Sequence, residues 1–293
     1  MKIAVTGAHG QLGGELCRQL CGDAIPLDID TCDLTDREAV RKTLRRLQPD
    51  VVINCAAYTR VDRAEQEPEL CRAVNTTSVV HLAESCGELD CPLVQISTDY
   101  VFGGGPDPGR PFREDDPPAP QGVYAQTKLE GERAAARHRK HLIVRTCGLY
   151  ARPSERRAEN FVKTMLRLAR SGQTVRVVGD QHCTPSYVPH VARAVLFLAG
   201  VPGLRPAPWD VYHVTNGGAA TWCEFAAEIF RLACMDVRLQ CITTAEYAAP
   251  APRPAYSVLD TTAYHRLGGP AMPDWKTALS EYFAQWKTLN PRS

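Results

Sequence analysis

The sequence predicts an α/β fold in which a doubly wound parallel sheet occupies the first half of the chain. Short β-rich runs alternate there with stretches that carry apolar residues at helical spacing. The runs are apolar without interruption, as in residues 51–53, which is typical of parallel strands covered on both faces. The first run ends directly in a glycine-rich turn. We expect strands at residues 2–6, 51–55, 92–97 and 142–145, and helices at 11–20, 36–47, 70–86 and 123–138.

Composition excludes several classes of protein. The 293 residues suffice for one large domain or two smaller ones, and a content of 44% hydrophobic and 23% charged residues excludes a disordered or fibrous chain. A net charge of +1 offers no field that would hold a polyanion, so we expect no nucleic-acid partner. No apolar run reaches the ~20 residues of a membrane span, and the first residues lack the apolar core of a secretory signal. We therefore expect a cytoplasmic protein without a membrane partner.

Three glycines, Gly7, Gly10 and Gly13, mark the turn between the first predicted strand and the first predicted helix. Glycines at this spacing allow a tight turn, let the backbone approach a pyrophosphate and pack the helix on the strand. The N-terminus of the helix offers free N–H groups and a positive dipole end to the phosphates. The turn predicts a Rossmann-type dinucleotide site.

An acidic residue, Asp28, ends the second β-rich run, 21 residues after Gly7. A carboxylate there can accept hydrogen bonds from the adenosine ribose and would repel a 2′-phosphate, which favours NADH. Asp33 and Leu34 follow, where they could meet the adenine edge.

Tyr124 and Lys128 stand four residues apart on a predicted helix and therefore share one face. A lysine cation close to a phenol stabilises tyrosinate, so we expect Lys128 to depress the pKa of Tyr124 from about 10 toward neutrality. Thr98 and Asp99 follow the predicted strand 92–97, at the edge where open parallel sheets bind ligands. The Thr98 hydroxyl could bind a carbonyl oxygen beside the phenol.

The regular alternation of β-rich and helical stretches ends after about residue 150. We predict an NAD(P)-binding domain over residues 1–150, completed by parts of residues 187–216. A smaller α/β substrate-binding domain is built mainly from residues 151–293, with helices at 160–171 and 275–286.

The twelve cysteines show no metal-binding spacing, so we expect no structural zinc and free thiols packed as small hydrophobic groups. Cys183 follows His182, an imidazole that could activate a thiol, but we favour simple packing for this residue too. Glu15 is a candidate ligand for Mg²⁺ at a dimer contact, but a solvated carboxylate is the simpler interpretation, and we predict no metal site.

Several longer motifs carry a resemblance to a known family. They are TGAHGQLG, NCAAYTRVDRAEQEP, the Asn-Thr-Thr stretch at 75–77, STDYVFGG, YAQTKLEGE, NFVKTMLRLA, GDQHCTPSY and RPAYSVLD. In this order they resemble the extended short-chain dehydrogenase/reductase superfamily and, within it, the dTDP-4-dehydrorhamnose reductase family. The likeness extends from residue 1 to about residue 290.

The resemblance implies a nucleotide-sugar ketoreductase that uses NADP(H) or NAD(H) to convert dTDP-4-dehydro-L-rhamnose to dTDP-L-rhamnose. Tyr124 matches the catalytic proton donor, and Lys128 matches the lysine that lowers the tyrosine pKa and holds the nicotinamide ribose. Thr98 and Asp99 match a pair near the sugar. The positions that match cofactor contacts are Gln11, Leu12, Asp28, Asp33, Leu34, Ala57, Tyr58 and Thr59.

Two residues of the second half, Asn160 and Arg253, are candidates for binding the substrate. The diphosphate of a nucleotide sugar calls for a cation, and the arginine fork matches phosphate geometry. Arg156 and Arg157 compete with Arg253 for this role. The chain departs from the family at Gly148, where an aromatic residue is frequent, and this leaves the identity or pose of the sugar open.

Three other functions compete with the reductase. A dehydratase of the same superfamily typically has Asp-Glu after the strand-end threonine, whereas Asp99 is followed here by Tyr100. The motif set also argues against a 4-epimerase. The regulatory beta subunit of methionine adenosyltransferase resembles the same reductases and need not turn over, but Thr98, Tyr124 and Lys128 are all present here. The sequence leaves monomer and homodimer open.

Overall fold

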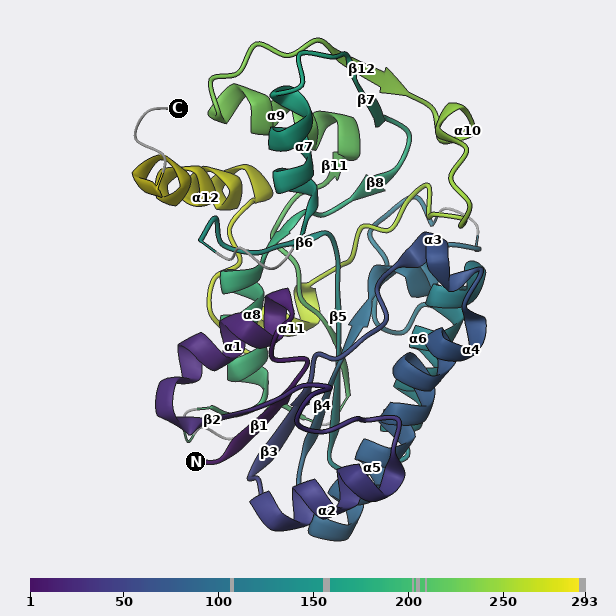
Figure 1. Cartoon of the computed structure of the whole chain (residues 1–293), viewed down its shortest axis with the longest axis vertical. Coiled ribbons are helices and arrows are strands. Elements are labelled where there is room, and N and C mark those ends of the chain that lie inside the picture. The colour runs from purple at the N-terminus through teal and green to yellow at the C-terminus, as the bar shows by residue number, and fades with distance from the viewer. Residues whose placement is uncertain (106–107, 155–158, 202, 204–205, 209, 290–293) are drawn as a thin grey trace.

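A six-stranded parallel sheet forms the centre of the structure, a computed structural model that describes residues 1–105, 108–154, 159–201, 203, 206–208 and 210–289 (Figure 1). Its strands are β1 (Ile3–Thr6), β2 (Ala24–Leu27), β3 (Val51–Asn54), β4 (Leu93–Thr98), β5 (His141–Thr146) and β10 (Val211–His213). Their order is β10-β5-β4-β3-β1-β2. The chain leaves β1 for β2 on one side and returns to β3 on the other. The order therefore reverses at β1, and α/β proteins bind ligands beyond such a point.

Helices cover both faces of this sheet, so the predicted doubly wound α/β class is confirmed. One face packs against α1 (Gln11–Leu20) and α8 (Val188–Leu198), through residues such as Leu16, Val191 and Val195. The other face packs against α2 (Arg37–Leu47), α5 (Ser78–Leu89) and α6 (Gly122–Ala135). Strands buried on both faces explain the uninterrupted apolar runs in the sequence.

The predicted helix over residues 70–86 is longer and less regular in the structure. Helix α4 (Pro68–Arg72) runs into a π-helical turn (Ala73–Thr77) and then into α5. The buried Asn75 lies in this turn. At the facing position of α6, a Cβ on Gly131 would lie 2.3 Å from the Asn75 carbonyl oxygen. The wide turn and the glycine let the two backbones approach closely.

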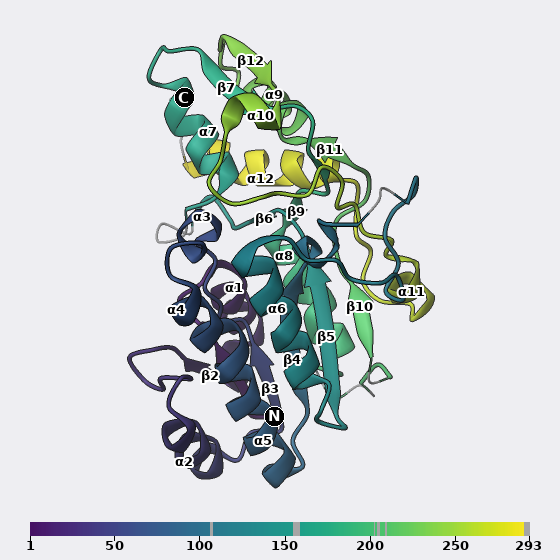
Figure 2. The ribbon, with the colours of Figure 1, turned by 90° about the vertical axis from the view of Figure 1, so that its right-hand side faces the viewer.

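A second core, which we call the C-terminal part, lies beyond the carboxyl ends of the sheet strands (Figures 1 and 2). It contains α7 (Phe161–Ala169), α9 (Trp222–Leu232) and α12 (Trp275–Leu289). Its paired strands are β6 (Leu149–Tyr150) with β9 (Ser186–Tyr187), β7 (Val175–Val178) with β12 (Leu239–Ile242), and β8 (His182–Cys183) with β11 (Ala220–Thr221). The remaining elements are α3 (Val61–Ala64), α10 (Thr244–Tyr247), α11 (Thr262–Arg266) and the 3₁₀ turns Cys21–Asp23 and Asp99–Phe102.

The expectation that all cysteines are free thiols is wrong for two of them. Cys223 and Cys241 form a disulfide with a Cα–Cα distance of 5.6 Å, and the other ten are free. The bridge ties the start of α9 to β12, two elements of the C-terminal part that pack together. Among the helices that the structure describes, none has the length and apolar character needed to cross a membrane.

Candidate active site

A cavity of about 580 Å³, which we call the central cavity, lies between the carboxyl ends of the sheet strands and the C-terminal part. Its lining comes from elements far apart in the sequence: the turn after β1, the segment after β3, the end of β4, one face of α6, the link after β5, and α9. The lining includes His9, Gly10, Gln11, Leu12, Ala57, Thr59, Thr98, Asp99, Tyr100, Tyr124, Lys128, Cys147, Gly148, Glu159, Trp222 and Ser257.

The glycine turn is shaped for close backbone approach. Gly7 has φ +63°, and a Cβ there would lie 2.6 Å from the Ala56 nitrogen. A Cβ on Gly13 would lie 2.2 Å from the Gly7 carbonyl oxygen, so neither position admits a side chain. Gly10 precedes α1 in an extended conformation and carries no side chain that could cap the helix. The first turn of α1 thus offers its N–H groups toward the cavity, which fits the pyrophosphate of a dinucleotide.

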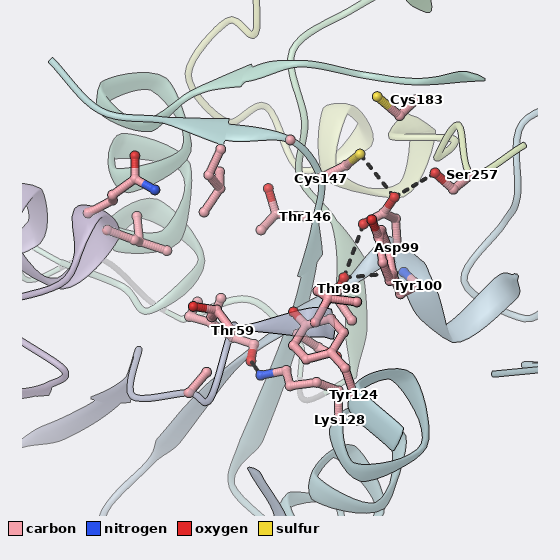
Figure 3. A pocket seen from close by; sticks show the side chains of 18 of the residues that line it. Thr59, Thr98, Asp99, Tyr100, Tyr124, Lys128, Thr146, Cys147, Cys183 and Ser257 are labelled. Carbon is pink, nitrogen blue, oxygen red and sulfur yellow. Dashed lines mark hydrogen bonds between the residues drawn. The ribbon is translucent and has the colours of Figure 1, made fainter. Parts of the chain in front are cut away.

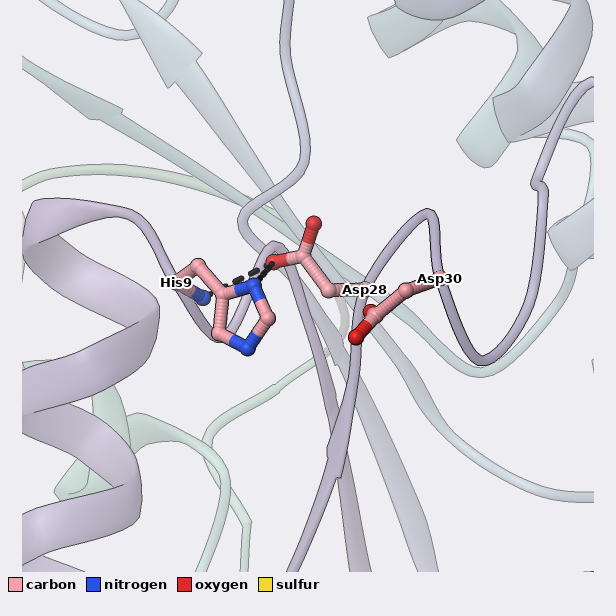
Figure 4. A group of neighbouring side chains, drawn as sticks. All are labelled: His9, Asp28 and Asp30. Atoms are coloured by element: carbon pink, nitrogen blue, oxygen red, sulfur yellow. Dashed lines mark hydrogen bonds and ion pairs between the residues drawn. The ribbon is translucent and has the colours of Figure 1, made fainter.

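Asp28 lies beside this turn, as the sequence predicts (Figure 4). Its Oδ2 accepts a hydrogen bond of 2.8 Å from the His9 N–H, and its Oδ1 accepts one of 2.9 Å from the Ile29 N–H. The His9 imidazole is 3.7 Å from the carboxylate, and Asp30 completes a group whose polar atoms lie within 4.8 Å of one another. His9 has no counterpart in the sequence prediction.

The other predicted cofactor positions divide into two groups. Ala57 and Thr59 line the cavity, and the N–H of Tyr58 between them donates to the Asn75 side-chain oxygen over 2.9 Å. Asn75 also donates to the Thr127 hydroxyl of α6 over 3.2 Å, so it fixes this segment against the helix. Asp33 and Leu34 do not line the cavity. Asp33 accepts hydrogen bonds from the backbone and hydroxyl of Thr35, and Leu34 packs against the core beneath α2.

The structure brings Thr98, Tyr124 and Lys128 together at the floor of the cavity (Figure 3). Thr98 ends β4, while Tyr124 and Lys128 project from α6. The Thr98 hydroxyl donates to Asp99 over 3.1 Å and accepts from the Tyr100 N–H over 3.2 Å. The Lys128 Nζ donates to the Ile96 carbonyl oxygen over 2.6 Å.

The predicted effect of Lys128 on the pKa of Tyr124 is not what the structure shows. Burial raises the pKa of Tyr124, and its interaction with the Thr98 side chain offsets only part of this rise. Burial also lowers the pKa of Lys128 from 10.5 to about 8. The lysine amine donates to the Ile96 carbonyl, and desolvation of the phenol is the largest influence on the Tyr124 pKa. Tyr124 is therefore protonated at neutral pH.

Comparisons with known proteins show which family the chain belongs to. A family model described as the RmlD substrate binding domain matches residues 1–288. A dTDP-4-dehydrorhamnose reductase of Streptomyces griseus is 42% identical, over 95% of this chain and 92% of the relative. The chain belongs to the dTDP-4-dehydrorhamnose reductase family.

Solved structures of such reductases share the fold. The reductase of Clostridium acetobutylicum is 39% identical and superimposes with a TM-score of 0.91, over 98% of this chain and 100% of that chain. The reductase of Bacillus anthracis, solved in complex with NADP, is 35% identical with a TM-score of 0.90, over 97% of this chain and 100% of that chain. These likenesses identify the chain as an oxidoreductase of the dTDP-4-dehydrorhamnose reductase type.

Asp99, one of the positions predicted from the dTDP-4-dehydrorhamnose reductase resemblance, is the centre of a buried polar cluster. Besides the Thr98 bond, its Oδ2 accepts from the Ser257 hydroxyl over 2.5 Å and from the Cys147 thiol over 3.0 Å (Figure 3). Burial raises the pKa of Asp99, and these hydrogen bonds oppose the rise. Sequence reasoning missed Cys147 and Ser257. Ser257 belongs to the motif RPAYSVLD and Cys147 precedes Gly148, but nothing in their local spacing points to Asp99.

Gly148, the position that departs from the dTDP-4-dehydrorhamnose reductase pattern, has φ +55°, and a Cβ there would lie 3.1 Å from the Pro185 Cα. The backbone thus favours glycine, because both its conformation and the neighbouring chain oppose a side chain. An aromatic side chain enters the cavity from another element instead: Trp222, the first residue of α9, is part of the lining. Sequence reasoning missed Trp222.

The two substrate candidates from the second half are engaged with other residues. Arg253 does not line the cavity, and its guanidinium pairs with Asp62 on α3. Asn160 is buried, caps α7 by accepting from the Lys163 N–H over 3.1 Å, and donates to Gln11. Arg156 and Arg157, which compete with Arg253 on sequence grounds, lie outside the described residues.

Glu15 does not offer a free carboxylate to Mg²⁺. Its oxygens accept hydrogen bonds from Arg18, Gln19 and Arg152 at 2.5–3.1 Å. Burial alone would raise its pKa, but these bonds lower the pKa of Glu15 to about 2. Two guanidinium groups already neutralise this buried carboxylate, which does not fit a cation ligand.

Proposed function

We propose that this enzyme reduces the C4 ketone of dTDP-4-dehydro-L-rhamnose to give dTDP-L-rhamnose, with NADPH or NADH as the reductant. The convergence of Thr98, Tyr124 and Lys128 in the central cavity carries the proposal. The names of the Streptomyces griseus and Salmonella typhimurium relatives support the choice of substrate.

The cofactor would lie across the glycine turn, held by residues 1–150 together with parts of 187–216. Gly7, Gly10, Gln11, Leu12 and Gly13 would bind the pyrophosphate, with Asp28 at the adenosine ribose. Asp33, Leu34, Ala57, Tyr58 and Thr59 would complete the site. When bound, the reduced nicotinamide supplies the hydride that ketone reduction needs.

Tyr124 would donate the proton that the C4 oxygen takes up. Its raised pKa keeps the phenol protonated at neutral pH, which suits a donor in the direction of reduction. Thr98, whose hydroxyl lines the same cavity as the phenol, would orient the carbonyl oxygen. Lys128 directs one of its N–H groups to Ile96, and we assign its remaining donors to the nicotinamide ribose.

The substrate would contact residues from both parts of the chain: Thr98, Asp99 and Tyr124 at the sugar, and Asn160 and Arg253 from the substrate-binding region, mainly residues 151–293. We further propose that the reaction takes place in the cytoplasm, where reduced nicotinamide is available, and that the product serves polysaccharide synthesis. A relative from Bacillus subtilis, 38% identical, is a spore coat polysaccharide biosynthesis protein.

The decisive experiment is turnover by the purified protein. NADPH or NADH is mixed with dTDP-4-dehydrorhamnose, and the nicotinamide absorbance and the sugar product are followed. We expect loss of absorbance in proportion to dTDP-L-rhamnose formed. Tight NADP binding without turnover would contradict the proposal and favour the alternative of a non-catalytic regulatory subunit like that of methionine adenosyltransferase.

A further inference from the structure

The side chain of Gln11 connects the glycine turn with the C-terminal part. Gln11 is the first residue of α1 and lines the central cavity. Its Oε1 accepts a hydrogen bond of 2.9 Å from the Ala151 N–H and one of 3.3 Å from the Asn160 Nδ2. A single amide oxygen thus binds two donors that are nine residues apart and lie beyond the sheet.

Asn160 links Gln11 to α7. The Asn160 Oδ1 caps the helix through the Lys163 N–H, and its Nδ2 reaches Gln11, so the two halves of one side-chain amide serve two elements. Asn160 is only 8% exposed, which restricts it to few conformations. Glu159, its neighbour, lines the cavity. A shift of Gln11 would therefore act on the cavity wall that the C-terminal part provides.

A second contact, one turn along α1, also holds this helix to the C-terminal part. Arg152 donates to both oxygens of the buried Glu15, at 2.9 and 3.1 Å, and to the Gln285 side chain of α12. The first two turns of α1 are thus bound to Ala151, Arg152 and Asn160. Gln11 differs from Glu15 in one respect: it also lies at the turn where the cofactor is proposed to bind.

We propose that Gln11 is a positioning residue that couples the two ligand sites, so that a dinucleotide at the glycine turn and a nucleotide in the substrate region each bind more tightly when the other is present. The proposal rests on the proposed function for the location of the dinucleotide. A bound pyrophosphate at the N-terminus of α1 fixes the first helical residue, and its Oε1 then holds Ala151 and Asn160 where the substrate needs them. Such coupling is reciprocal and typically about 5–150-fold.

The test is a thermodynamic cycle on the full-length enzyme. The Kd of NADPH is measured by fluorescence without and with saturating dTDP, and the Kd of dTDP without and with NADPH. For the wild type we expect each ligand to tighten the other about fivefold or more. For each ligand, the ratio of the Kd without the other ligand to the Kd with it measures the coupling. This ratio is informative even if a variant weakens the binding of both ligands.

Two variants remove the connection from opposite ends. Gln11→Met keeps the length of the side chain but removes the acceptor. Asn160→Asp keeps the Oδ1 that caps α7 but removes the Nδ2 donor. Both should bring the coupling ratio to within about twofold of one. Gln11→Glu retains the acceptor and should keep the coupling, even if its charge weakens NADPH binding.

Gln19→Met is the matched control, because Gln19 lies on the same helix and binds Glu15 and the Pro189 carbonyl instead. It should keep the wild-type ratio. A wild-type ratio of one, or an unchanged ratio in Gln11→Met and Asn160→Asp, would overturn the role of Gln11. Failure of NADPH or dTDP to bind at all would instead overturn the proposed function.

Discussion

Arg253 and Asp62 form a two-pronged ion pair, with Arg253 Nη2 2.8 Å from Asp62 Oδ2 and Nη1 3.0 Å from Oδ1. The pair joins the proline-rich segment 248–256 to α3, and the Ala251 N–H adds a third bond to the same carboxylate. The guanidinium is mostly buried, whereas the carboxylate is 42% exposed. A substrate diphosphate would have to compete with Asp62 for this cation.

Removing the competing carboxylate should reveal whether Arg253 binds phosphate. We expect Asp62→Asn to lower the Kd of dTDP about fivefold, a change of about 1 kcal/mol, as for a partly exposed pair. Arg253→Ala should raise it by more, and calorimetric titration measures both. If Asp62→Asn only lowers the melting temperature and leaves dTDP binding unchanged, Arg253 is a tether for the segment.

Replacing the phenol should remove the proton donor while sparing the cofactor site. We expect Tyr124→Phe to lower kcat by about 10²–10⁴-fold. The Kd of NADPH should stay within about twofold, as measured by fluorescence titration. Tyr212→Phe is the control, because its hydroxyl bonds the Pro208 carbonyl next to β10, away from the cavity. Near-normal turnover by Tyr124→Phe would show that another group supplies the proton.

The buried Lys128 should make stability depend on pH. Its pKa is about 8 in the folded protein against 10.5 for an ordinary lysine, so between these values the unfolded chain binds more protons. The free energy of unfolding therefore rises with pH in this window. Relative to Lys128→Met, the wild type should gain about 1 kcal/mol between pH 8 and pH 9, measured by urea unfolding. Lys42→Met, at an exposed position of α2, controls for the loss of a lysine. A difference that is constant across this range would contradict the prediction.

The Cys223–Cys241 bridge should be visible in thiol counts and in stability. Under denaturing conditions we expect ten reactive thiols before reduction and twelve after it. The bridged residues are 18 apart in sequence, so the bridge should contribute about 3 kcal/mol to the free energy of unfolding. A reducing agent should lower the melting temperature of the wild type but not that of a Cys223→Ala, Cys241→Ala variant. Twelve thiols in the unreduced protein would rule out the bridge.

Asp28 should influence the choice between NADH and NADPH. Its carboxylate lies at the adenosine end of the proposed site, where a 2′-phosphate would face a like charge. We expect Asp28→Asn, which keeps an oxygen for the His9 N–H, to improve NADPH relative to NADH about tenfold, or about 1.4 kcal/mol. The measurement is the ratio of the two Kd values. An unchanged ratio would mean that the 2′ position lies elsewhere.

The sequence was sufficient for those parts of the fold that local chemistry determines. The starts of β1, β3 and β4 lie within one residue of prediction, because an apolar run and the turn next to it define a buried parallel strand. The glycine turn could be predicted as well, because a side chain at Gly7 or Gly13 would clash with the neighbouring backbone.

Contacts between segments far apart in the chain could not be predicted from the sequence. The spacing of Tyr124 and Lys128 places them on one face of α6, but only the packed structure shows the Ile96 carbonyl that engages the lysine. Cys223 and Cys241 meet because the start of α9 packs close to β12, and no spacing rule predicts this. The partner of Arg253 could not be read from its own surroundings in the sequence, because it lies 191 residues away.

The edge strand β10 has a consequence for synthesis on the ribosome. It pairs Val211 with Ile143 and His213 with Arg145, so the sheet is complete only after residue 213 has emerged. A nascent chain that has reached residue 150 displays the free edge of β5 and the bare apolar face that α8 later shields. Such surfaces attract other polypeptides, so translation exposes this intermediate to aggregation until α8 and β10 arrive.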